Sequence, residues 1–247
     1  MKRVVKTLFA IILLSVALVS SYKVFTTLYA YKQADKVYDD LREKKEMQED
    51  KVYDDLSEKK EISKKDTNFG IDLSDVNKDY VCWINVENTN IDYPIVQSDD
   101  NSYYLHRDIY GNYLYSGTIF IDYRCDYNTS KNLIIYGHNM KNNTIFSEIE
   151  RFKEKDFFYS NPKITLTDKN KSSDYEVFAV IVVHKNFDYI VFDFENEGDY
   201  EDYLNKIINK SIYKSKNTPT SKDKIITLTT CSYEFDNART VVFAKKI

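Results

Sequence analysis

The sequence predicts a mainly β domain, built as an antiparallel sheet or barrel, behind an N-terminal transmembrane helix and a helical stalk. Three observations predict this class. Beyond Asn68, short β-branched and aromatic runs outnumber helical patterns without alternating regularly with them, which argues against a doubly wound α/β fold. An almost continuous apolar run extends from Leu8 to Val19. Between Lys32 and Asp66, 22 of 35 residues are charged, and neither Gly nor Pro occurs.

The composition describes one globular domain with additional segments. The 247 residues include 35 Lys or Arg against 39 Asp or Glu, a formal net charge of -4, and 43% are hydrophobic. The 22 Tyr and 14 Phe supply enough apolar surface for a sizeable core. A slightly acidic chain without a long basic run lacks the positive surface that binds nucleic acid, so we expect no nucleic-acid partner.

The N-terminus has the positive, apolar, polar order that is typical of a membrane anchor. The 16 residues between Lys6 and Lys23 span roughly 24 Å as a helix, at ~1.5 Å per residue. Snorkelling of the two lysines extends this length toward the hydrocarbon thickness of about 30 Å. The positive-inside rule puts residues 1–6 in the cytoplasm and residues 7–25 in the cell membrane as a single-pass signal anchor. The rest of the chain is then extracellular.

A cleaved signal peptide is the alternative for the same segment. Val19 and Ser21 match the small-residue positions that precede a cleavage site. We favour the uncleaved anchor, and the sequence alone leaves both interpretations open.

Residues 26–68 form the predicted stalk. Their charge and their lack of Gly and Pro favour a long solvated helix. The stalk contains an internal repeat, DKVYDDLREKKE at 35–46 and DKVYDDLSEKKE at 50–61, offset by 15 residues or about four helical turns. We interpret the stalk as a charged spacer with a narrow apolar stripe that can pack on the next domain. The stripe comprises Val37, Leu41, Val52 and Leu56.

Residues 69–247 form the predicted globular domain. Eight runs rich in β-branched and aromatic residues are predicted as strands: Tyr80–Val86, Ile91–Val96, Gly117–Tyr123, Asn132–Tyr136, Lys163–Thr167, Asp174–Val183, Lys224–Thr230 and Arg239–Lys245. Three stretches have helical spacing: Asp100–His106, Thr144–Phe152 and Asp199–Tyr213. The third has a wide apolar face that comprises Tyr203, Leu204, Ile207, Ile208 and Ile212.

Three side chains at predicted strand ends have the chemistry of nucleophilic catalysis. His138 follows a strand through Gly137, and Cys231 ends the strand that begins at Lys224. Arg239 begins the last strand eight residues after Cys231, so a hairpin brings its guanidinium beside the sulfur. An Arg cannot act as a base at neutral pH, but it can favour a thiolate and donate hydrogen bonds to an oxyanion. Cys231, His138 and Arg239 can then converge.

The other histidines and cysteines are assigned structural roles. His106, at the end of a predicted helix, and His184, where a strand gives way to a loop, are interpreted as packing or surface residues. Three widely spaced cysteines are too few for a zinc site or a disulfide scaffold. We expect Cys82, inside a strand, and Cys125, in a polar stretch, not to form a disulfide with each other.

Several segments resemble the class B sortases. They are YGHNM at 136–140, TLTTCSYEF at 227–235, NARTVVFA at 237–244, WINVENTNIDYPIVQ from Trp83, NSYYLHRD from Asn101, SGTIFIDYR from Ser116, and Phe146–Phe158. The likeness continues in order over residues 80–247 and is joined by the N-terminal anchor. It implies an eight-stranded sortase-type β-barrel with a few helices, and a cysteine transpeptidase on the outer face of a Gram-positive cell. It implies no metal or organic cofactor.

The resemblance also implies substrates and residue roles. The substrates are surface proteins with a C-terminal sorting signal of the Asn-Pro-x-Thr-Asn or Pro-Pro-x-Thr-Gly kind. By position, Cys231 attacks the Thr carbonyl to form a thioacyl-enzyme, His138 exchanges protons with the departing and incoming amines, and Arg239 stabilises the oxyanion. An amine of a peptidoglycan precursor then resolves the thioester. The peptide groove, by position, comprises Asn101, Leu105, Tyr136, Tyr189, Ile190 and Thr229.

The loop beside the nucleophile departs from the family pattern. Ser232 stands where some members have an acidic residue, and the spacing of eight from Cys231 to Arg239 is shorter than in some others. Both departures bear on substrate preference and not on the type of reaction.

Two other functions fit parts of the same sequence. A cysteine hydrolase of another fold would use Cys231 and His138, but it normally orients the imidazole with an Asn or Asp. A stalked, non-enzymatic surface protein would bind peptides and keep Cys231 as a core residue. Transfer to an added amine separates a transpeptidase from the hydrolase, and rapid alkylation of Cys231 excludes the binding protein.

Overall fold

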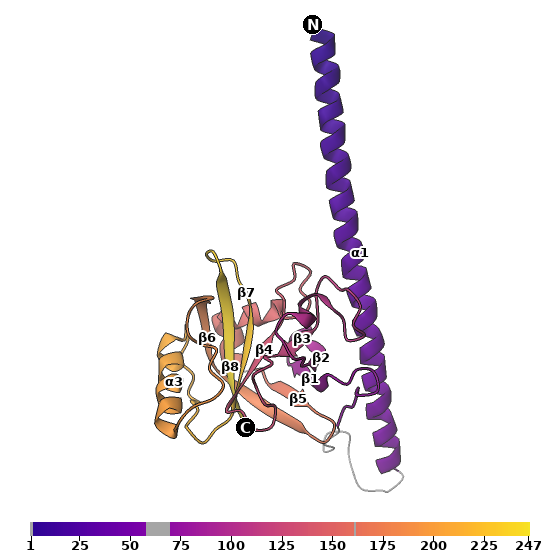
Figure 1. The fold of residues 1–247 in the computed structure, drawn as a ribbon. Coiled ribbons are helices and arrows are strands. Elements are labelled where there is room, and N and C mark those ends of the chain that lie inside the picture. Colours follow the sequence, from indigo (N-terminus) through magenta and orange to yellow (C-terminus); the bar gives the residue numbers. More distant parts are fainter. Residues whose placement is uncertain (1, 58–69, 161) are drawn as a thin grey trace.

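The computed structural model describes the backbone of residues 2–57, 70–160 and 162–247 (Figure 1). Its eight strands close into a barrel in the order β1-β2-β3-β4-β7-β8-β6-β5, which confirms the expected architecture. The strands are β1 (Tyr80–Val86), β2 (Asp92–Val96), β3 (Ile119–Ile121), β4 (Asn132–Tyr136), β5 (Ile164–Thr167), β6 (Ser172–His184), β7 (Ile225–Cys231) and β8 (Ala238–Lys246).

The barrel is not purely antiparallel. The pairs β2–β3 and β4–β7 are parallel, and a repeating β-branched pattern cannot distinguish a parallel partner from an antiparallel one. The β4–β7 pair matters for the site because parallel strands end at the same edge. Tyr136 at the end of β4 stands opposite Thr229 near the end of β7, and Cys231 stands opposite Arg239 on antiparallel β8. The predicted strand ends therefore meet.

The helices are shorter or differently placed than the sequence predicts. Within the predicted helix at 100–106, only η1 (Tyr103–His106) is helical, as one 3-10 turn. The predicted helix at 144–152 is η2 (Ser147–Lys153), followed by α2 (Lys155–Ser160). The third is α3 (Glu197–Lys210), which Asn196 caps by accepting a hydrogen bond from the Asp199 amide.

Two apolar layers hold the domain together. One is a large cluster of buried residues that includes Trp83, Phe146 and Phe152 and extends to Leu41 of the N-terminal helix. The other lies between α3 and the outer face of β6, β7 and β8, where Leu204 and Ile207 pack beside Phe243. The prediction that the apolar face of α3 extends to Ile212 is wrong. The chain leaves the helix at Ser211, and the Ile212 amide donates a hydrogen bond to the Val180 carbonyl. Ile212 is 47% exposed.

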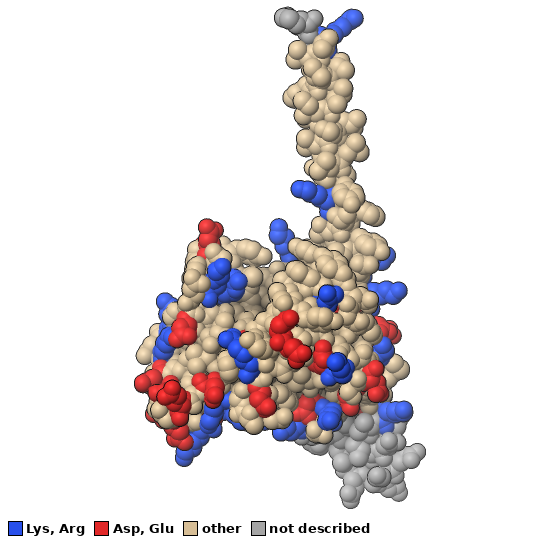
Figure 2. All heavy atoms as spheres, in the orientation of Figure 1, with Lys and Arg blue, Asp and Glu red and all other residues tan. Residues whose placement is uncertain are grey.

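Helix α1 (Lys2–Ser57) runs unbroken from the N-terminus past the barrel (Figure 1). Its outer part stands clear of the barrel and presents a mostly uncharged surface, whereas charges of both signs cover the visible face of the domain (Figure 2). Further along, Ala34, Tyr38 and Leu41 are at most 3% exposed against the barrel. Lys45 bonds the Asp92 carboxylate at 2.8 Å. The first repeat copy is therefore a packed element and not a free spacer.

The second repeat copy is described only in part, and the side chains of Val52 and Leu56, the rest of the predicted stripe, lie outside the described residues. The helix backbone is described to Ser57, and residues 58–69, which include the end of that copy, lie outside the described residues. The predicted boundary at residue 25 between anchor and stalk falls inside one continuous helix.

Candidate active site

Gly137 directly follows β4 and leaves room for the ring of Phe146. A Cβ at this position would lie 2.6 Å from Cγ of Phe146, closer than any side chain tolerates. Thr230 on β7 donates a hydrogen bond to the Gly137 carbonyl at 2.7 Å, and Asn139 donates to the Cys231 carbonyl at 2.8 Å. These bonds fix the segment around His138 to the end of β7. Sequence reasoning missed both partners, although Asn139 lies within the YGHNM segment.

Cys231 and Arg239 are cross-strand neighbours on β7 and β8. Cys231 is half-buried, whereas Cys82 and Cys125 are buried, and all three are free thiols. Burial raises the pKa of the Cys125 thiol to about 11, and it raises the pKa of Cys82 still further. Within the described chain, Cys231 is therefore the thiol with access to a substrate.

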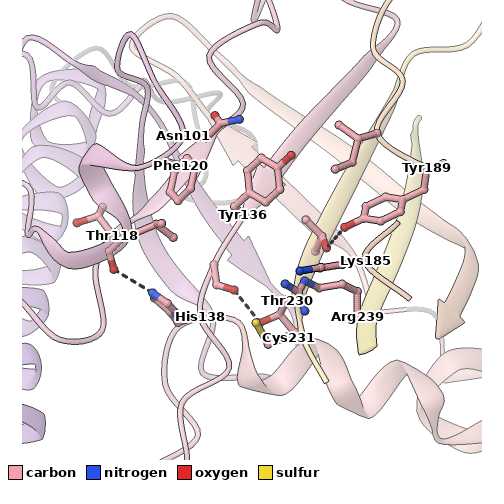
Figure 3. Close-up of a pocket in the computed structure, with 14 residues that line it drawn as sticks. Asn101, Thr118, Phe120, Tyr136, His138, Lys185, Tyr189, Thr230, Cys231 and Arg239 are labelled. Atoms are coloured by element: carbon pink, nitrogen blue, oxygen red, sulfur yellow. Dashed lines mark hydrogen bonds between the residues drawn. The ribbon is translucent and has the colours of Figure 1, made fainter. Parts of the chain in front are cut away.

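A single cavity of about 290 Å³ joins the three predicted catalytic residues. Figure 3 shows Cys231, Lys185 and Arg239 on one side of it and His138 on the other. All six residues predicted for the peptide groove contribute to its lining. The lining comprises Asn101, Leu105, Thr118, Phe120, Tyr136, Gly137, His138, Lys185, Tyr189, Ile190, Thr229, Thr230, Cys231 and Arg239.

His138 is held by a backbone carbonyl. Its Nε2 lies 2.9 Å from the Leu105 carbonyl oxygen, which can only accept, so Nε2 carries the proton (Figure 3). Nδ1 is then the nitrogen that gains or loses a proton. Burial lowers the pKa of the His138 imidazole, the bond to Leu105 partly opposes this, and the nearby His106 lowers it further. A lowered pKa makes the protonated imidazole a stronger acid and leaves a smaller fraction of it protonated near neutrality.

A buried carboxylate organises one wall of the cavity. The Asp122 carboxylate accepts two hydrogen bonds from Arg124 at 2.8 Å, one from the Tyr136 hydroxyl at 2.9 Å and one from Asn101 at 3.0 Å. Burial alone would raise the pKa of Asp122, but these hydrogen bonds hold it below its ordinary value. The sequence analysis quoted SGTIFIDYR without assigning Asp122 a role. The Asp-x-Arg spacing within it was the available signal.

The opposite wall depends on α3. The Tyr189 hydroxyl and the Thr229 hydroxyl share a hydrogen bond at 3.0 Å, and Tyr203 on α3 donates to the Tyr189 carbonyl at 2.7 Å. The helix therefore restrains the groove. Within the described residues, no group of three His, Cys, Asp or Glu side chains is placed to hold a metal ion.

Comparison with known proteins identifies the family and the fold. The protein-family model of the sortase domain matches residues 84–247 of this chain. The chain belongs to the sortase family. Sortase B of Listeria monocytogenes is 40% identical over 182 residues, which are 71% of this chain and 73% of that protein. Sortase B of Staphylococcus aureus is 32% identical over 98% of this chain and 96% of that protein.

The solved structures place this sortase in class B. The Staphylococcus aureus sortase B–substrate complex is similar with a TM-score of 0.75 and 32% identity, and it covers 87% of this chain and 97% of that one. The protein is thus a class B sortase, a cysteine transpeptidase whose family binds sorting-signal substrates.

One described helix of this sortase, within residues 3–51, is long and apolar enough to cross a membrane, and no part of its apolar stretch is buried by the described residues. A membrane anchor and a signal sequence both fit that stretch.

Proposed function

We propose that this sortase cleaves a C-terminal sorting signal after its Thr and transfers the surface protein to an amine of a peptidoglycan precursor. The signal is of the Asn-Pro-x-Thr-Asn or Pro-Pro-x-Thr-Gly kind. Cys231 acts as nucleophile, His138 as acid and base, and Arg239 as the donor to the oxyanion. The peptide lies between Asn101, Leu105, Tyr136, Tyr189, Ile190 and Thr229.

One observation carries the proposal: Cys231 and Arg239 stand opposite each other on paired strands, facing the cavity that also holds His138. An Arg beside a cysteine is unsuited to orienting an imidazole, which is the role of Asn or Asp in papain-like hydrolases. It is suited to holding the developing negative charge of a tetrahedral intermediate with a planar set of donors. The arrangement supports acyl transfer through the thiol.

The proposed reaction has two halves. In the first, Sγ of Cys231 bonds to the Thr carbonyl carbon, the carbonyl oxygen becomes an oxyanion beside Arg239, and the C–N bond breaks as His138 gives a proton to the amine. In the second, the acceptor amine attacks the thioester carbon, His138 takes its proton, and the thiolate leaves. The proton that His138 donates in the first half is thus recovered in the second.

We further propose that the apolar part of α1 is an uncleaved, single-pass anchor with its short N-terminal end in the cytoplasm. Lys2, Arg3 and Lys6 lie before the apolar run, as the positive-inside rule requires of a cytoplasmic end. The barrel then lies outside the cell, where both proposed substrates occur.

The test uses full-length protein in detergent with a fluorescent sorting peptide, with and without a labelled amine. We expect a covalent thioacyl-enzyme by intact mass and a peptide–amine conjugate that increases with amine concentration. Cys231→Ala should give neither product. Peptide hydrolysis at a rate independent of the amine, without conjugate, would contradict the transfer step.

A further inference from the structure

A second imidazole lies against the catalytic histidine. The rings of His106 and His138 are nearly parallel, with centroids 5.4 Å apart and an interplanar angle of 19°. Tyr115 is stacked on His106 as well, at 6.4 Å and 21°, and Tyr113 lies at 6.3 Å and 32°. The Nδ1 of His106 lies 3.3 Å from the Tyr115 carbonyl. His106 is therefore one layer of an aromatic stack that reaches the reacting imidazole.

The segment that carries His106 is firmly anchored. Within η1, the Tyr104 side chain is buried, and its hydroxyl donates to Asp79 at 2.8 Å and accepts from Asn77 at 2.7 Å. The Tyr104 carbonyl accepts from the Thr118 amide at 3.1 Å. Leu105, from the same turn, accepts the hydrogen bond from His138. One short turn thus provides both a hydrogen-bond acceptor and a ring face to the catalytic imidazole.

The described lining of the cavity around this pair contains no Asp or Glu. The titratable side chains whose rings contact His106 are His138, Tyr113 and Tyr115. The neighbouring Arg107 extends over the Tyr103 ring, at 4.8 Å. Among the described residues that line the cavity, the ionisable ones besides His138 and Cys231 are Lys185, Arg239 and tyrosines, with no Asp or Glu. A positive charge on His106 is therefore felt directly by His138.

We propose that His106 is a positioning residue for His138, which it restrains by stacking, and that its charge sets the pH range over which His138 is protonated. The proposal rests on the acid and base role of His138 given above. Two positive charges on adjacent stacked imidazoles repel each other, so a charge on one ring makes protonation of the other less favourable. Histidine is the side chain that ordinarily changes charge between pH 5 and 8.

The direction of the effect follows from the sign of the charge. A neutral ring in place of His106 removes a repulsive partner, so the pKa of His138 should rise. A permanent cation in the same place should lower it. His106→Phe keeps the stacked ring and removes the charge, His106→Lys keeps the charge and removes the ring, and His106→Ala removes both. The three variants therefore separate stacking from charge.

The first measurement is an NMR titration of full-length protein in detergent, with labelled histidines in a Cys231→Ala background. The chain has only three histidines, so single substitutions assign every signal. We expect the His138 midpoint to rise by about half a pH unit or more in His106→Phe and to fall in His106→Lys. His184→Phe is the control, because His184 is exposed and outside the cavity lining, and it should shift nothing.

The second measurement is the pH profile of kcat for peptide cleavage with Cys231 present. The limb of the kcat–pH profile that depends on His138 protonation should shift in His106→Phe and His106→Lys in the same direction as the His138 titration midpoint seen by NMR. The KM should change little. His106→Ala should lower kcat by about threefold to tenfold at the optimum through lost stacking, and His106→Phe should restore most of it.

An unchanged His138 midpoint in both His106→Phe and His106→Lys would overturn the proposal. So would equal losses of kcat in His106→Ala and His106→Phe at every pH. Failure of the proposed function looks different: absence of a thioacyl-enzyme in the wild type would remove the catalytic role of His138, yet leave the NMR shifts unaffected.

Discussion

The catalytic cavity has two kinds of wall, and they depend on different parts of the sequence. One kind is the strand-built wall: Thr229, Cys231 and Arg239 belong to β7 and β8, so the register of two paired strands fixes their spacing. The other kind is the loop-built wall: Leu105 belongs to the short turn η1, and Tyr189, which shares a hydrogen bond with Thr229, follows the end of β6. The first wall is built by local strand pairing and the second by packing between distant segments.

The second wall is held from outside the barrel. On α3, Tyr203 donates to the Tyr189 carbonyl. On α1, the buried Tyr38 hydroxyl donates to the carbonyl of Gly117. Gly117 has a φ of +58°, and a Cβ there would lie 2.4 Å from the Leu105 carbonyl oxygen, so only glycine allows the approach. Changes to the strand-built wall should therefore alter kcat, whereas changes to α3 or α1 should alter stability and peptide binding.

The largest effect is expected from Cys231→Ala. Without a sulfur nucleophile, no thioacyl-enzyme forms, and peptide cleavage should fall by at least about 10³-fold. Peptide affinity and melting temperature should stay close to those of the wild type, because the half-buried side chain loses only one atom. Intact mass, fluorescence anisotropy and thermal unfolding measure the three quantities. Turnover at the wild-type rate would refute the proposed mechanism.

The next largest effect is expected from Arg239→Lys on the same wall. A lysine keeps the charge but not the planar fork of donors, so kcat should fall about 10²-fold to 10³-fold with a smaller change in KM. Lys185→Met is the matched control, since it removes the other cation of the cavity lining without touching Arg239. Its kcat should fall less than about tenfold. Equal losses in the two variants would mean that positive charge alone matters.

The strand-built wall could be predicted from the sequence because it depends on local strand pairing. The strand ending at Cys231 and the strand beginning at Arg239 are recognisable from β-branched residues, and the short connection between them forces a hairpin. Their convergence with His138 needed the parallel β4–β7 pair, which the local pattern does not specify. The resemblance to the sortases, carried by YGHNM and TLTTCSYEF, supplied that step.

The loop-built wall could be predicted only in part. Its residues were identified through the resemblance, but what holds them was not, because Tyr203 and Tyr38 reach this wall from two separate helices. His106 was interpreted as a packing or surface residue, since nothing in its local sequence indicates that its ring meets His138. The predicted apolar face of α3 extends to Ile212 because the helical spacing of apolar residues continues that far. The helix ends earlier because the chain after it forms a hydrogen bond with β6.

Among changes to the two helices that hold the loop-built wall, the larger effect on stability is expected from Ile207→Asp on α3. Ile207 is fully buried against the barrel, so a carboxylate there should lower the free energy of unfolding by about 3–5 kcal/mol. Loosening of Tyr189 should also raise the peptide KM. The alkylation rate of Cys231 in the folded protein should hardly change, because β7 and β8 pair independently of the helix.

Ile212→Asp is the matched control for α3. It introduces the same charge five residues later, at a side chain that is 47% exposed, and should change stability by less than about 1 kcal/mol. Equal destabilisation by the two substitutions would show that burial against the barrel is not the cause.

The smallest effect is expected from Tyr38→Phe on α1. Burial raises the pKa of the Tyr38 hydroxyl, so it stays protonated and donates to the Gly117 carbonyl at every pH used in assays. Phenylalanine keeps the ring packed beside Tyr93 but leaves that carbonyl unpaired, which should cost about 1–2 kcal/mol of stability. Because Gly117 contacts the turn that carries Leu105, the peptide KM should rise about twofold to threefold, with kcat hardly altered. Tyr29→Phe removes a hydroxyl from an exposed part of the same helix and should change neither quantity. An unaltered KM in Tyr38→Phe, with the expected loss of stability, would show that α1 stabilises the barrel without restraining the groove.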